Sequence, residues 1–166
     1  TILLVFTTAK ALATHYKMDT SITGATALVC FLCLTPFVSD ATIGEYVTTY
    51  YLGAAAMFTG FISALIAVEL LRFLMGFKAL IIKMPDSVPS GIARSLNSII
   101  PVALTVIIFG VVRILTDALG APLNDLIFNW IQTPFTNIVS SPIGLVIIYA
   151  LYMLIWGFGI HSAYIF

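Results

Sequence analysis

Apolar runs separated by short polar segments dominate the pattern of the chain. A helix that crosses a bilayer needs roughly 20 mostly apolar residues, and by that measure we expect about five spanning segments. The first of them is too short to be complete, so it is interpreted as the end of a helix. The predicted segments are residues 1–12, 20–38, 51–75, 101–114 and 142–161.

Two further stretches are amphipathic. In residues 88–99 an apolar stripe ends just before Pro101, which predicts a helix lying on the membrane surface. In residues 123–135 apolar side chains recur at helical spacing, and Pro122 suits the start of such a helix. Its apolar stripe is Leu123, Leu126, Ile127, Trp130, Ile131 and Phe135, and its polar face is Asn124, Asp125, Asn129, Gln132 and Thr133. The pattern predicts an all-α fold, a polytopic helical membrane protein with interfacial amphipathic helices.

Composition supports a membrane protein. The chain has 166 residues, 61% of them hydrophobic and 8% charged, whereas a soluble domain is about 25% charged. Seven basic and seven acidic residues give zero net charge, so nucleic acid is not expected as a partner. The chain begins at Thr1 inside an apolar run and shows no signal-peptide pattern. We expect a fragment of a longer membrane protein.

Basic residues predict the orientation. If each span crosses once, Lys10, Lys17, Arg72, Lys78, Lys83 and Arg94 fall on one side and Arg113 on the other. Because cytoplasmic loops carry the excess of Lys and Arg, the side with Lys17 and Lys83 is predicted to be cytoplasmic. Glu69 and Arg72, three apart, and Arg113 and Asp117, four apart, have the spacing of local ion pairs.

The candidate chemistry lies at the end of the last apolar run, in Trp156-Gly-Phe-Gly-Ile-His161. Ionisable groups at membrane depth are expensive and usually face a protein interior or a water-filled cavity. From the residues alone, a histidine satisfied by a backbone carbonyl and a tryptophan that packs or anchors at the interface stay open as structural readings. Cys30 and Cys33 are interpreted as packing residues, because further metal ligands are not close to them in the sequence. We expect no catalytic residue, metal or cofactor.

Two stretches together resemble a known family. They are Lys83-Met-Pro-Asp-Ser-Val-Pro-Ser-Gly-Ile-Ala-Arg-Ser95 and Trp156-Gly-Phe-Gly-Ile-His161. Both are similar to motifs of the membrane-spanning enzyme IIC subunits of the bacterial phosphotransferase system, in the lactose, cellobiose and diacetylchitobiose group. The likeness runs over nearly the whole chain. Ser162 stands where that family usually has glycine, Gly157 where a bulkier residue is common, and the family's later Asn-Glu-Pro motif is absent from this chain.

The resemblance implies a homodimeric sugar permease of the bacterial plasma membrane, which passes its sugar to a cytoplasmic phosphotransferase subunit. Phosphoryl transfer would belong to partner subunits and not to residues of this chain. Residues 1–137 would form the scaffold and dimerisation part, and residues 138–166 the start of the substrate-binding part. His161 and Trp156 match the family's sugar-binding histidine and the aromatic residue just upstream. The alternative is a membrane scaffold or receptor module without transport; a membrane-embedded enzyme is disfavoured, because the sequence shows no carboxylate pair, metal cluster or activated nucleophile at workable spacing.

Overall fold

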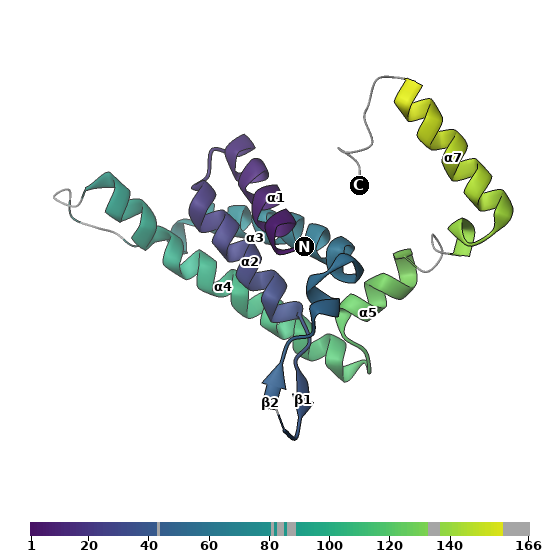
Figure 1. The fold of residues 1–166 in the computed structure, drawn as a ribbon. Coiled ribbons are helices and arrows are strands. Elements are labelled where there is room, and N and C mark those ends of the chain that lie inside the picture. The colour runs from purple at the N-terminus through teal and green to yellow at the C-terminus, as the bar shows by residue number, and fades with distance from the viewer. Residues whose placement is uncertain (43, 81, 83–84, 86–88, 133–136, 158–166) are drawn as a thin grey trace. The chain divides into compact units, whose positions relative to one another are not determined.

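The chain forms two compact units, Thr1–Leu126 and Ile127–Phe166. The computed structural model describes residues 1–42, 44–80, 82, 85, 89–132 and 137–157 (Figure 1). The first unit contains most of the helical core, and the second begins within a helical segment and includes a long apolar helix.

Among its described residues, the first unit is built mainly from four helices of 14 to 29 residues. In it α1 packs against α2 and α3, and α4 lies along α2 and α3 (Figure 1). The bounds are α1 Ile2–His15, α2 Thr20–Leu34, α3 Met57–Met75 and α4 Ser90–Ala118, with short 3₁₀ turns η1 Thr49–Leu52, η2 Ala54–Ala56 and η3 Lys78–Leu80. The predicted helical fold is confirmed, since the described residues contain only one small pair of strands.

The tight turn between α1 and α2 is encoded locally. Lys17 adopts a left-handed conformation with φ 56°, and its amide donates to the carbonyl oxygen of Thr14 (3.2 Å) while that of Met18 donates to Ala13 (2.9 Å). This pair of bonds is a Schellman motif, which satisfies the last carbonyls of α1. Asp19 then caps the N-terminus of α2, because its carboxylate accepts hydrogen bonds from the backbone amides of Ser21 (3.0 Å) and Ile22 (2.9 Å).

Small side chains let α1 lie close to its neighbours. The buried stripe of α1 is Val5, Ala9 and Ala13, four residues apart, which places them on one helix face. A Cβ on Gly24 would lie 2.8 Å from the Phe6 ring, and one on Gly60 would lie 2.9 Å from Val5 Cγ2. Glycine at these two positions is therefore what allows α2 and α3 to approach α1 so closely.

Hydroxyl groups buried in the unit are largely satisfied within their own helices. Thr26 donates to the Ile22 carbonyl (2.7 Å), Thr35 to that of Phe31 (3.0 Å) and Thr105 to that of Pro101 (2.8 Å). Such bonds let small polar residues occupy packed helix faces without the cost of an unpaired buried group.

The sequence prediction of a surface helix ending before Pro101 is wrong. One continuous helix, α4, runs from Ser90 to Ala118 with Pro101 inside it. Its buried face includes Ser98, Pro101, Thr105 and Phe109, and the members Ile92, Leu96 and Ile99 of the predicted apolar stripe are on its exposed side. A proline interrupts a helix because it lacks the N–H. In apolar surroundings, however, helices tolerate proline, since neighbouring side chains and local adjustments satisfy the freed groups.

The segment after α2 also differs from the prediction. The sequence predicts a helical segment over the apolar run 20–38, but α2 ends at Leu34, before Pro36. Two antiparallel strands follow, β1 Val38–Asp40 and β2 Gly44–Tyr46, with Ser39 opposite Glu45. A proline disfavours helical geometry in the residue before it. Pro36 therefore accounts for the helix end before Thr35.

Two helical stretches of the described residues are long and apolar enough to cross a membrane, Ala54–Met75 and Gly91–Ala118. The helices α1 and α2 are apolar but shorter. These bounds agree with the predicted segments 51–75 and 101–114 in position, although the second is longer than expected.

The amphipathic stretch 123–135 is helical where it is described. It comprises α5 Leu123–Ile127 and a π-helical turn, η4 Phe128–Gln132. Trp130, on the predicted apolar stripe, has 86% of its surface exposed, whereas Asn124, on the predicted polar face, is buried. The assignment of Asn124 to an exposed polar face is therefore wrong, because the spacing of apolar residues alone does not tell which face of a helix is covered.

We predict that Gly60→Leu lowers the stability of the purified, detergent-solubilised protein by about 1–3 kcal/mol, the usual range for overpacking. The reason is that even a Cβ at this position would lie 2.6 Å from Thr1 Cγ2 and 2.9 Å from Val5 Cγ2. The matched control is Gly110→Leu in α4, where a Cβ meets nothing within 4 Å. Its unfolding temperature should stay level or rise, since leucine favours helix over glycine. Equal unfolding temperatures for the two variants would contradict the close packing of α1 on α3.

Candidate functional site

The helix α7, Pro142–Gly157, carries the predicted site toward its C-terminal end. Its start is defined by Ser141, whose hydroxyl oxygen accepts from the Gly144 amide (2.9 Å), and by Pro142, whose ring suits the first helical turn. Both features occur where the sequence predicted the last apolar segment to begin.

Of the two candidate binding residues, Trp156 lies in the last turn of α7 and His161 lies outside the described residues. A rise of 1.5 Å per residue places Trp156 about 20 Å along the helix from Pro142. The remaining stem of α7 is apolar, and Ile143, Val146 and Tyr149 are exposed on it. Within the described residues, the candidate tryptophan is thus carried at the far end of a helix with an apolar surface.

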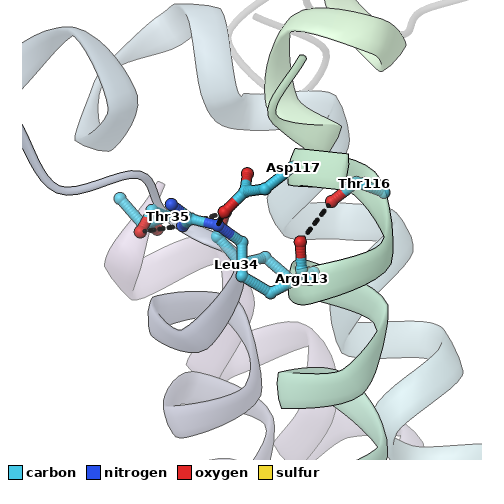
Figure 2. A network of polar contacts seen from close by, with 5 residues as sticks. All are labelled: Leu34, Thr35, Arg113, Thr116 and Asp117. Carbon is cyan, nitrogen blue, oxygen red and sulfur yellow. Dashed lines mark hydrogen bonds and ion pairs between the residues drawn. The ribbon is translucent and has the colours of Figure 1, made fainter. Parts of the chain in front are cut away.

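A polar network at the C-terminal end of α2 joins that helix to α4 (Figure 2). Arg113 Nη1 donates to the carbonyl oxygens of Thr35 (2.7 Å) and Leu34 (3.4 Å), and Arg113 Nε contacts Asp117 Oδ2 at 2.5 Å. The last carbonyls of a helix have no intrahelical donor, and a guanidinium supplies several donors with a fixed geometry. Arg113 therefore caps α2 from a neighbouring helix while its charge is balanced by Asp117. The predicted local pair of Arg113 and Asp117 is confirmed.

A second contact lies in the same unit, between η1 and α5. The hydroxyl of Tyr51 donates to Asp125 Oδ2 (3.3 Å). Next to it in the sequence, Asn124 is buried with both side-chain polar atoms lacking a hydrogen-bond partner within the described part of the chain. Buried amides are normally paired, so Asn124 is an exception in this core.

At the opposite end of α2, Tyr16, Glu69 and Arg72 form a cluster. The Tyr16 hydroxyl donates to Glu69 Oε1, Arg72 Nη1 lies 3.3 Å from Glu69 Oε2, and the Arg72 guanidinium lies 4.2 Å from the centre of the Tyr16 ring. The hydrogen bond to Glu69, more than any other influence, raises the pKa of Tyr16 above its usual value. The predicted pair of Glu69 and Arg72 is confirmed, and both side chains are about half exposed.

The two cysteines have only apolar residues as immediate neighbours in the sequence. Cys30 is buried in the core, Cys33 is partly buried, and both thiols are free. No group of three or more His, Cys, Asp or Glu side chains in this part of the chain is placed to hold a metal ion.

Comparison with known proteins places the chain in a family. The family model "Phosphotransferase system, EIIC" matches residues 1–166. The chain therefore belongs to the phosphotransferase system EIIC family, as the sequence motifs indicated.

Relatives and a solved structure agree with this. The chain is 32% identical to the oligo-beta-mannoside-specific EIIC component of Bacillus subtilis, over 97% of this chain and 37% of that protein. It is 27% identical to the cellobiose-specific EIIC component of Geobacillus stearothermophilus, over 95% of this chain and 37% of the relative. The crystal structure of the transporter ChbC, the IIC component of the N,N'-diacetylchitobiose-specific phosphotransferase system, matches with a TM-score of 0.74 and 30% identity, over 96% of this chain and 39% of ChbC. The chain thus spans less than half the length of each of these proteins.

Sequence reasoning found the ion pairs inside single helices but missed the contacts between helices. The hydrogen bonds from Arg113 to Thr35 and from Tyr16 to Glu69 join residues that are far apart in the chain. For Arg113 the need for a donor became visible only in the structure, where α2 ends at Leu34 and leaves its last carbonyls without an intrahelical donor.

We predict that Arg113→Gln destabilises the protein by about 1–3 kcal/mol, because it leaves buried carbonyls of α2 without their donor. The control is Asp117→Asn, which keeps the guanidinium in place. The Asp117 side chain is 44% exposed and that of Arg113 is 19% exposed, so Asp117→Asn should cost less than about 1 kcal/mol. Thermal unfolding of both variants in detergent tests this order; a larger loss for Asp117→Asn would show that the ion pair, not the cap, is what matters.

Proposed function

We propose that this chain is part of the sugar permease subunit of a phosphoenolpyruvate-dependent phosphotransferase system. The observation that carries the proposal is the match of the EIIC family model to residues 1–166. The Trp156-to-His161 motif, which lies inside the matched residues, also supports it. The subunit would bind sugar, move it inward, and present it for phosphorylation by a partner subunit, so this chain itself would carry no phosphoryl group.

The substrate class that we propose is a disaccharide-type sugar such as cellobiose, lactose or diacetylchitobiose. The relatives named for oligo-beta-mannoside and cellobiose, and ChbC named for N,N'-diacetylchitobiose, support this class. Sugars of this kind present hydroxyl groups and an apolar C–H face, so a site for them combines hydrogen-bonding side chains with an aromatic ring.

We assign His161 and Trp156 to that site. A neutral imidazole offers one donor and one acceptor to sugar hydroxyls, and burial away from water favours the neutral form. The indole of Trp156 would cover a sugar face. The position of Trp156 at the end of the apolar helix α7 supports a site at membrane depth.

The proposed setting is the bacterial plasma membrane, with several spans, a homodimer, and a cytoplasmic phosphotransferase subunit as partner. We propose residues 1–137 as the scaffold and dimerisation part and residues 138–166 as the start of the substrate-binding part. The span-length helices and the exposed apolar side chains of α4, such as Ile107, Val111 and Ile114, support a bilayer as surroundings. A scaffold or receptor module without transport is the alternative; failure of the complete protein to bind any of these sugars would favour it.

The orientation that we propose has the turn between α1 and α2 in the cytoplasm and the β1–β2 hairpin outside. Cysteine labelling in intact cells tests it, in a variant whose Cys30 and Cys33 are replaced by alanine. Ser39→Cys, on the exposed strand β1, should react with an impermeant maleimide from outside. Ser87→Cys should react only after the cells are made permeable. The reverse pattern would overturn the orientation.

For the site, we predict that His161→Ala weakens sugar binding about ten- to a hundredfold while the protein stays folded and keeps its oligomeric state. The loss of a partner for a buried polar group costs about 1–3 kcal/mol, and about 1.4 kcal/mol corresponds to tenfold in affinity. The measurement is binding of labelled cellobiose, lactose and diacetylchitobiose to the purified, complete protein.

The chain offers matched controls. His15→Ala, at the end of α1, and Trp130→Ala, whose side chain is exposed, remove the other histidine and the other tryptophan. Both should leave sugar affinity unchanged, whereas Trp156→Ala should lower it. Wild-type affinity of His161→Ala for every sugar that the protein binds would remove His161 from the site.

A further inference from the structure

A cavity of about 360 Å³ lies at the end of the first unit where α1 turns into α2. Three elements line it, namely the α1–α2 turn with the start of α2, the end of α3, and the start of α4. Its lining residues are Lys17, Met18, Asp19, Ile22, Thr23, Leu71, Arg72, Met75, Arg94 and Ser98. The volume is within the range of about 300–1,000 Å³ that small-molecule sites occupy.

Positive charge dominates the polar part of this cavity. Lys17, Arg72 and Arg94 reach it from three different elements, and Asp19 is the single carboxylate among the lining residues. The Asp19 carboxylate already accepts from two backbone amides at the start of α2. The cavity therefore brings together cations that are distant in sequence and gathers little negative charge to balance them.

In the described residues, two of the three cations, Lys17 and Arg94, form no ion pair with a carboxylate and can bind an added anion. Glu69, outside the lining, pairs with Arg72 at 3.3 Å. Two unpaired cations beside one cavity repel each other, and an anion between them removes that repulsion.

Apart from Thr23 and Ser98, the rest of the lining is apolar. Met18, Ile22, Leu71 and Met75 contribute side chains to the wall, so an occupant that fills the cavity has one anionic end and one apolar end. A free phosphate ion would meet the cations and leave the apolar wall wet. An anionic phospholipid has both parts, with a phosphodiester for the cations and glycerol and acyl carbons for the wall.

We propose that this cavity is a binding site for the phosphate group of an anionic phospholipid. Lys17 and Arg94 hold the phosphodiester, Arg72 adds a third charge that is shared with Glu69, and the apolar wall holds the first carbons of the lipid. Basic pockets between helices at the cytoplasmic face are where anionic headgroups bind in membrane proteins, and our proposed orientation puts this cavity on that face.

The test uses the purified, complete protein in a neutral detergent and three probes. These are dioctanoyl phosphatidylglycerol, dioctanoyl phosphatidylcholine with the same tails, and inorganic phosphate. We expect saturable binding of phosphatidylglycerol, followed as a rise in unfolding temperature and by native mass spectrometry. The zwitterionic lipid and inorganic phosphate should bind at least tenfold more weakly. Added salt should weaken phosphatidylglycerol binding, because it screens exposed charges.

The variants are Lys17→Gln and Arg94→Gln, each of which removes one cation and keeps a polar side chain. Each should lower affinity for phosphatidylglycerol about tenfold, because charge-assisted hydrogen bonds are among the stronger polar contacts. The matched control is Lys78→Gln, which removes an exposed cation of η3 outside the cavity lining and should leave affinity unchanged. Unfolding temperatures without lipid check that all variants fold.

Each outcome decides the proposal. Equal affinity for inorganic phosphate and phosphatidylglycerol would identify a free-phosphate site and overturn the lipid. Equal binding of phosphatidylcholine, or an equal loss in Lys78→Gln, would overturn a specific headgroup site. Sugar binding is measured separately and does not enter these comparisons, so failure here leaves the proposed transport function untouched.

Discussion

Close contact of α1 with α2 and α3 is the constraint on which the first unit depends. Between helices in a membrane there is little hydrophobic driving force, since lipid tails are as apolar as leucine, so packing contacts and polar bonds must hold them together. Gly24 and Gly60 leave room for the side chains of Phe6 and Val5. Larger residues at these two positions would push α2 and α3 away from α1. The burial of the alanines of α1 and the cavity at the C-terminal end of α1 both depend on the short distance between these helices.

Much of the helical framework could be read from the sequence. Apolar runs located α1, α3 and α7 in position, and Pro142 marked the start of α7 by local chemistry alone. Ion pairs within a helix followed from spacing of three or four residues. These predictions succeeded because each depends on residues that are close together in the chain.

The wrong predictions concern residues whose conformation or burial is decided by packing between helices that are distant in the chain. Pro101 was interpreted as a boundary because its local preference is unambiguous, yet packing on α2 and α3 continues the helix through it. Asn124 was assigned to an exposed face from periodicity, which does not reveal which face of a helix the core covers. The candidate sugar site came from a motif alone. Trp156 lies in the last turn of α7 and His161 lies outside the described residues, and the roles of both residues stay predictions.

The conformation of Lys17 has a consequence for how this turn tolerates change. Left-handed backbone costs a non-glycine residue about 1–2 kcal/mol, and glycine is the residue that usually ends a helix in this motif. A lysine at φ 56° therefore makes the turn less stable than glycine would make it. The same residue provides a cation to the cavity wall, so Lys17→Gly would stabilise the turn and at the same time remove that charge. Local rules of this kind are most often broken where a side chain has a function.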